Sequence, residues 1–153
     1  MENILKQKFA WTDSELEKEK KRICKSVYKH EKHEQGFNDS DALATWWIEQ
    51  LKIQKGCCNY CDTSIKLIRD LIDNDLLAGR PVKGDAIRGC NLELERKDHK
   101  FGYTPENCVL ICYYCNNDKS NVYPWDEYKK YLAPAKHNHF MALADILNKK
   151  SAA

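Results

Sequence analysis

In a chain of 153 residues, residues 94–121 read LERKDHKFGYTPENCVLICYYCNNDKSN, and their pattern is the most informative about the fold. Residues 91–95, which lead into this stretch, alternate polar and apolar side chains, as half-buried strands do. Residues 102–107 have the composition of a turn, and residues 108–112 are short, apolar and β-prone. A helix is expected to begin near Cys115 and Asn116. The stretch therefore predicts the order strand, long turn, strand, helix.

Two pairs of cysteines have the spacing of metal ligands. Cys58 and Cys61 form one CxxC pair, and Cys112 and Cys115 form the other. Each CxxC turn directs two thiolates toward one point, so two turns complete a tetrahedral Zn²⁺ site. Such a closed site is structural, because it contributes folding free energy and leaves no open position for chemistry. Cys57 adjoins this motif, but the spacing to Cys61 makes Cys58 the better ligand.

The composition is that of a globular chain, with 42% hydrophobic and 31% charged residues. No apolar run reaches the roughly 18 residues of a membrane span, and the N-terminus lacks the apolar core of a signal peptide. We therefore expect a cytoplasmic protein with no membrane partner. The net charge of +2, from 25 basic and 23 acidic residues, is not that of a strongly basic nucleic-acid-binding domain. A DNA-binding face would have to be a local patch.

Helices are predicted on both sides of the opening stretch. Apolar residues at helical spacing place them at residues 12 to about 32, 41–55, 64–77, 124–132 and 140–147. The first begins with a capping box from Thr12 to Glu15. Trp46 and Trp47 share the apolar face of the second helix, so we expect them to pack in the core rather than stack on bases. Residues 78–89 contain three glycines and a proline and are expected to form a loop.

Residues 95–121 resemble the HNH (ββα-metal) nuclease motif. They share its acidic-Arg-x-Asp start at residues 95–98, its Gly-Tyr turn at residues 102–103 and its terminal Cys-x2-Cys-Asn-x2-Lys at residues 112–119. The similarity is to the zinc-bound branch, which includes phage HNH proteins and some rare-cutting restriction enzymes. It covers about 30 residues closely and extends loosely back to Cys58. The resemblance implies an α+β fold in which helices at both ends flank a small zinc-stapled ββα-metal core.

The same resemblance suggests how the chain is organised. Residues 1–56 would be a helical N-terminal extension packed on the core, residues 57–133 the zinc-bound nuclease core, and residues 134–153 a C-terminal helix or tail, all in one compact domain. The implied partner is DNA, in a bacterial or phage-infected cell. One ββα site cuts one strand, so a double-strand cut requires a homodimer or two successive nicks.

The resemblance also assigns ligands for a catalytic cation, Mg²⁺ or Mn²⁺, which takes oxygen ligands. Glu95 matches the first-strand carboxylate of the family, and Asn116 matches the helix residue that supplies the second ligand. Asp98 is a further candidate ligand, with a turn-stabilising role as the alternative. Asn107 matches the asparagine that braces the loop through backbone hydrogen bonds.

The sequence departs from the family at two positions. The family usually has Asp at the position of Glu95, and its general-base histidine would stand at Arg96. Arginine cannot accept a proton, although it can clamp a phosphate with two hydrogen bonds. His99, whose side chain has a suitable intrinsic pKa, and Tyr103 are the alternatives for the base.

Basic side chains near the motif are candidates for phosphate contacts. Lys119 would reach a phosphate or cap local carbonyls, and Arg88 would contact DNA from the loop, unless that loop only solubilises the chain. Three functions follow: a DNA endonuclease, a catalytically inactive zinc-knuckle DNA-binding protein, or a purely structural zinc protein. The third leaves Glu95, Asn107 and Asn116 without an explanation.

Overall fold

The computed structural model describes residues 9–28 and 36–153, and its architecture is α+β, as the sequence predicts. The chain divides into two units. The first unit contains Met1–Gly56 and Glu95–Leu110, and the second unit contains Cys57–Leu94 and Ile111–Ala153. One break therefore falls between residues 56 and 57.

The first unit begins with helix α1 (Asp13–Arg22), which has the predicted capping box. The Thr12 hydroxyl accepts the Glu15 N–H at 3.2 Å, and the Glu15 carboxylate accepts the Thr12 N–H at 2.7 Å. The helix continues as a π-helical segment, η1 (Ile23–Val27). Its predicted end near Lys32 lies outside the described residues.

Helix α2 (Ser40–Ile53) packs on α1 and η1 in the same unit. Both tryptophans are buried, Trp46 at 9% exposure and Trp47 at 1%, which confirms their predicted place in the core. The helix is followed by Gln54, whose amide donates to the Leu110 carbonyl at 2.8 Å and accepts the Leu110 N–H at 3.2 Å. These two bonds fix strand β4 (Cys108–Ile111) to the end of α2 within the first unit.

The predicted strand–turn–strand–helix order is present. Strand β3 (Glu93–Arg96) pairs with β4 in a two-stranded sheet, and helix α4 (Tyr113–Lys119) follows β4 directly. The helix begins earlier than predicted because the Cys112 thiol caps it, accepting the Cys115 N–H at 3.4 Å. A hydrogen bond from the Lys97 N–H to the Asn107 carbonyl, at 2.7 Å, closes the base of the loop between the strands.

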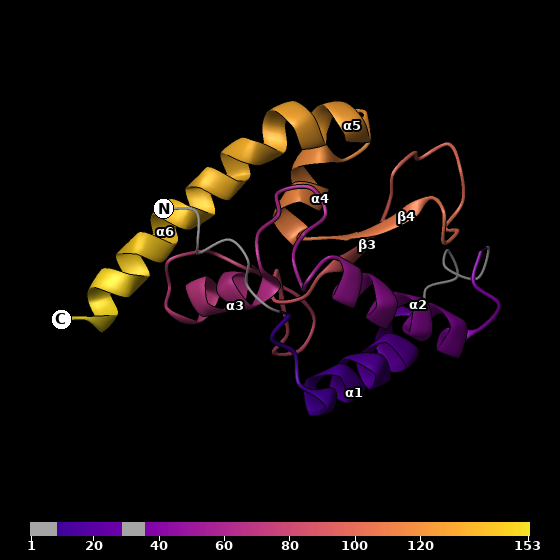
Figure 1. Cartoon of the computed structure of the whole chain (residues 1–153), viewed down its shortest axis with the longest axis horizontal. Helices are drawn as coiled ribbons and strands as arrows, with labels where there is room; N and C mark the ends of the chain where they lie inside the picture. Colours follow the sequence, from indigo (N-terminus) through magenta and orange to yellow (C-terminus); the bar gives the residue numbers. More distant parts are fainter. Residues whose placement is uncertain (1–8, 29–35) are drawn as a thin grey trace. The chain divides into compact units, whose positions relative to one another are not determined.

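The second unit also contains helix α3 (Ile65–Asp73), which contacts the long C-terminal helix α6 (Ala133–Ser151). Figure 1 shows α6 continuing from α5 (Trp125–Glu127), through the π-helical segment η3 (Tyr128–Leu132). Phe140 and Ala144 of α6 are buried, whereas Ile146 is 44% exposed. Within the described residues no helix is long and apolar enough to cross a membrane.

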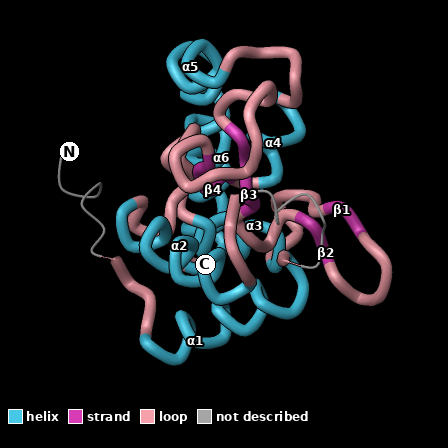
Figure 2. Tube along the Cα trace, turned by 90° about the vertical axis from the view of Figure 1, so that its right-hand side faces the viewer, coloured by secondary structure: helices cyan, strands magenta, loops and turns pink. Residues whose placement is uncertain are grey.

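The prediction that all of residues 78–89 form a loop is wrong in part. Strands β1 (Arg80–Pro81) and β2 (Ile87–Arg88) pair antiparallel there and form the arms of a small hairpin (Figure 2). Near its tip Gly84 has φ of 81°, a conformation that glycine adopts without strain. Strands of two residues, one of them proline, carry no readable periodicity, which is why the sequence indicated only a loop.

Candidate functional site

The four predicted zinc ligands lie together in the second unit. The Sγ atoms of Cys58, Cys61, Cys112 and Cys115 are all within 4.8 Å of one another, and all four residues are buried. The Sγ atoms of Cys61 and Cys112 are 3.9 Å apart. Four sulfurs bound at 2.3 Å around one tetrahedral Zn²⁺ would be separated by about 3.8 Å. The donor set and its spacing therefore fit zinc.

Local backbone geometry explains why these thiols converge. The Cys58 N–H donates to the Thr63 carbonyl at 3.0 Å, and the Asp62 N–H donates to the Cys58 carbonyl at 2.9 Å. Asp62 has φ of 55°, so the chain turns back on itself directly after Cys61. Cys57 is half-buried, and the cluster includes Cys58 in its place, as the x2 spacing predicts.

The thiols influence one another's protonation. Hydrogen bonds from Cys112, then Cys115 and Cys58, lower the pKa of the Cys61 thiol well below its usual value. The pKa of Cys112 is raised well above its usual value by its hydrogen bonds with the other three thiols and by burial. A cluster of four thiols therefore retains protons that a divalent cation must displace, so metal affinity falls as the pH is lowered.

Aromatic and polar residues surround the cysteine cluster. Tyr128 is fully buried, its ring centroid is 5.7 Å from that of Tyr60, and its hydroxyl donates to Asp118 at 3.1 Å. Burial is the main reason that the pKa of Tyr128 is raised. The Thr63 hydroxyl lies 3.1 Å from Nδ1 of His137. Sequence reasoning missed these neighbours, because nothing in the local pattern indicates a contact between residues so far apart in the chain.

The loop between β3 and β4 is held by one side chain. Asn107 Oδ1 accepts the Asp98 N–H at 3.1 Å, and Nδ2 donates to the carbonyls of Asp98 at 2.9 Å and Gly102 at 3.1 Å. The Asp98 carboxylate accepts the Lys100 N–H at 2.9 Å, which is a turn-stabilising contact. Gly36 approaches the same loop, and a Cβ there would overlap the Tyr103 carbonyl.

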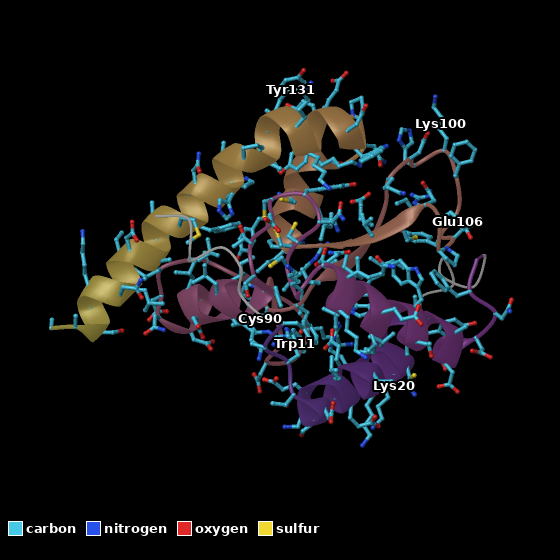
Figure 3. All side chains as sticks on the ribbon, in the orientation of Figure 1. Trp11, Lys20, Cys90, Lys100, Glu106 and Tyr131 are labelled. Carbon is cyan, nitrogen blue, oxygen red and sulfur yellow. The ribbon has the colours of Figure 1, made fainter. Side chains whose placement is uncertain are left out.

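The predicted catalytic side chains of the first unit lie on this loop and at the end of β3. The Arg96 guanidinium is 4.7 Å above the Tyr103 ring, and its Nη1 lies 3.3 Å from the His99 carbonyl and 3.4 Å from that of Phe101. His99 and Lys100 are exposed, and Figure 3 shows Lys100 pointing outward from the loop. The loop thus presents an imidazole and an ammonium group to solvent.

In the second unit Asn116 belongs to a polar cluster that the sequence did not predict. Its Nδ2 donates to Glu93 Oε2 at 2.6 Å. The Arg88 guanidinium binds the same carboxylate at 2.6 and 2.9 Å and lies 4.8 Å above the Tyr113 ring. The hydrogen bond with Glu93 is the main cause of the raised pKa of Arg88. The alternation of the strand places Glu93 on the same face as Glu95, and this pattern could have indicated Glu93 as a site residue.

The remaining predicted site residues lie as follows. Glu95 is half-buried on β3 and belongs to the first unit, whereas Asn116 belongs to the second. Lys119 is only 2% exposed, and its Nζ is 3.4 Å from the Ser120 carbonyl, a contact of the carbonyl-capping kind. Phosphate contacts by Lys119 and Arg88 stay predictions. Comparison of the chain with protein-family models, with curated proteins and with solved structures finds no match.

Proposed function

We propose that the protein is a metal-dependent endonuclease that hydrolyses DNA phosphodiester bonds and is stabilised by a zinc ion at its four clustered cysteines. The observation that carries the proposal is the loop between β3 and β4, which Asn107 braces with three backbone hydrogen bonds. Helix α4, which holds Asn116, follows this loop and β4 in the chain. The resemblance to the HNH motif supplies the chemical interpretation of that order.

Two metals with different roles are needed. Four thiolates leave no open coordination position, so zinc at the cysteine cluster would not activate water or bind a phosphate. A hard cation, Mg²⁺ or Mn²⁺, takes oxygen ligands, and the resemblance to the HNH motif assigns the side-chain oxygen of Asn116 as one of them. Bound at the scissile phosphate, such a cation would stabilise the charge that develops on the leaving oxygen.

We propose His99 as the general base that accepts a proton from the attacking water. Its side chain is exposed at the loop, where water reaches it. The ring of Tyr103, the alternative base, lies beneath the Arg96 guanidinium. Arg96 itself offers no acceptor for the proton. In the position described it is suited to hold the loop and to offer positive charge to a phosphate.

Nicking of supercoiled plasmid DNA in the presence of Mg²⁺ tests the proposed activity. Asn116→Ala should slow nicking at least about 100-fold, because loss of a metal ligand is at least as costly as loss of a residue that supports one. Asn117→Ala is the matched control, since Asn117 is the exposed neighbour on the same helix and should leave the rate unchanged. Equal rates for wild type and Asn116→Ala, or no nicking by the wild type, would contradict the proposal.

A second candidate function is DNA binding without cleavage. It is favoured by Arg96, which occupies the place of the usual base and is engaged with the Tyr103 ring. A gel-shift measurement on the same proteins separates the two functions. Binding of duplex DNA by a wild-type protein that nicks nothing would support the inactive zinc-knuckle function, whereas absence of both would leave a structural zinc protein.

A further inference from the structure

The cluster around Asn116 fixes the orientation of its side-chain amide. We infer that Glu93 is a positioning residue, which holds Asn116 by its Nδ2 so that Oδ1 is presented to the metal. This inference rests on the proposed function. A carboxylate has acceptors and no donor, so only the amide nitrogen of Asn116 can occupy the 2.6 Å contact with Glu93 Oε2. The oxygen of the planar amide then points to the opposite side.

This orientation matters because the amide group has two ends of nearly equal size, one oxygen and one nitrogen. Its oxygen is a suitable ligand for a hard cation, whereas its NH₂ group has no lone pair to offer. Without a partner that is only a hydrogen-bond acceptor, the Asn116 side chain can rotate and present its nitrogen to the cation in place of its oxygen. Residues that orient metal ligands typically change metal affinity by about 10- to 100-fold when they are removed.

Arg88 keeps Glu93 in position for this task. Its Nε and Nη2 bind the two carboxylate oxygens at 2.6 and 2.9 Å, so Oε2 is shared between Arg88 and Asn116. The guanidinium lies over the Tyr113 ring at 4.8 Å, which limits its own movement. The pair is neutral as a whole and would not compete for the cation as a free carboxylate would. The β1–β2 hairpin, which carries Arg88, thereby acquires a role in the site.

A purely structural ion pair is the alternative explanation, and the chain supplies a control for it. Glu19 and Arg22 in the first unit form the same bidentate pair at 3.0 and 2.6 Å. The Arg22 guanidinium also lies over an aromatic ring, that of Trp47, at 5.5 Å. Breaking either pair removes a carboxylate–guanidinium interaction, but only Glu93 contacts Asn116.

The experiment measures Mn²⁺ binding to the full-length, zinc-loaded protein from the electron paramagnetic resonance signal of free Mn²⁺. Glu93→Met, which has similar length and no acceptor oxygen, should weaken Mn²⁺ binding about tenfold. Glu93→Gln presents a donor as well as an acceptor, so it no longer selects the amide nitrogen of Asn116 and should also weaken Mn²⁺ binding. Glu19→Met should leave Mn²⁺ binding unchanged, whatever it does to the melting temperature. If Glu93→Met does not fold, Glu93→Asp, whose carboxylate is drawn back from Asn116, replaces it with the same expected weakening.

A double-mutant cycle tests whether Glu93 orients the Asn116 amide or only stabilises the site in general. In the Asn116→Asp background both side-chain oxygens are equivalent and orientation no longer matters, so adding Glu93→Met should not weaken Mn²⁺ binding further. Wild-type binding by Glu93→Met, or equal weakening in both backgrounds, would overturn the positioning role while plasmid nicking by the wild type left the proposed function intact. A wild-type protein that neither binds Mn²⁺ nor nicks DNA would overturn both.

Discussion

Asn107 shows how much of the loop depends on one side chain. Its amide replaces the backbone partners that a loop of this length lacks, satisfying the Asp98 N–H and the carbonyls of Asp98 and Gly102. The family resemblance pointed to this residue because the interactions are local. It did not point to Glu93, whose partners Arg88 and Asn116 come from separate elements. At the scale of single residues, sequence reasoning finds the short-range contacts and misses the tertiary ones.

Asn107→Asp should destabilise the protein by about 2 kcal/mol, because it removes two donors and places a negative charge against the carbonyls of Asp98 and Gly102. Urea unfolding at neutral pH measures the change. Asn117→Asp makes the same chemical substitution at an exposed position of α4 and is the control. If the two variants have the same free energy of unfolding, the hydrogen bonds of the Asn107 side chain contribute nothing to stability.

The identity of the base is a second prediction at this scale. His99→Ala should slow plasmid nicking by about 10²- to 10⁴-fold, the usual contribution of a general base. Tyr103→Phe keeps the ring beneath the Arg96 guanidinium and removes only the hydroxyl, so the rate should change little. Single-turnover rates at matched protein concentration provide the comparison. The opposite ranking would assign the proton transfer to Tyr103, and full activity in both variants would exclude both residues as the base.

At the scale of elements, whether the sequence predicted a helix or strand depended on the length of the segment. The sequence predicted β3, β4 and α4, because each has a local pattern of several residues. The thiol cap at Cys112 moved the start of α4, a detail that a cysteine does not signal in a sequence. The β1–β2 hairpin went unpredicted, because two-residue strands carry no period. The two CxxC turns were readable because ligand spacing is a chemical constraint within four residues.

The two CxxC turns lead to a prediction about zinc binding, and the neighbouring Cys57 supplies its control. Cys58→Ser should lower the zinc content and unfold the second unit, since structural zinc sites contribute directly to folding free energy. Cys57→Ser changes the adjacent thiol, which lies outside the cluster, and should leave both zinc content and circular dichroism unchanged. Native dichroism and melting for Cys58→Ser, or loss of zinc from Cys57→Ser, would contradict the ligand assignment.

At the scale of the whole molecule, the cysteine cluster joins distant parts of the chain. The ligands come from the two segments of the second unit, Cys57–Leu94 and Ile111–Ala153. Zinc binding by small domains is worth about 10–16 kcal/mol, and the stability of a whole domain is about 5–15 kcal/mol. Removal of zinc from the proposed site should therefore be enough to unfold this unit. The sequence indicated the cysteine cluster, but it did not indicate that residues 95–110 would group with the N-terminal helices, because such grouping depends on tertiary contacts.

We propose that zinc stabilises the fold, whereas a second cation would support the hydrolysis. The test is to incubate zinc-loaded protein, freed of other divalent ions, with supercoiled plasmid DNA and then to add Mg²⁺. We expect no nicking before the addition and nicking after it, with circular dichroism and zinc content unchanged throughout. Nicking at the same rate with and without Mg²⁺, or no nicking in either condition, would contradict the claim.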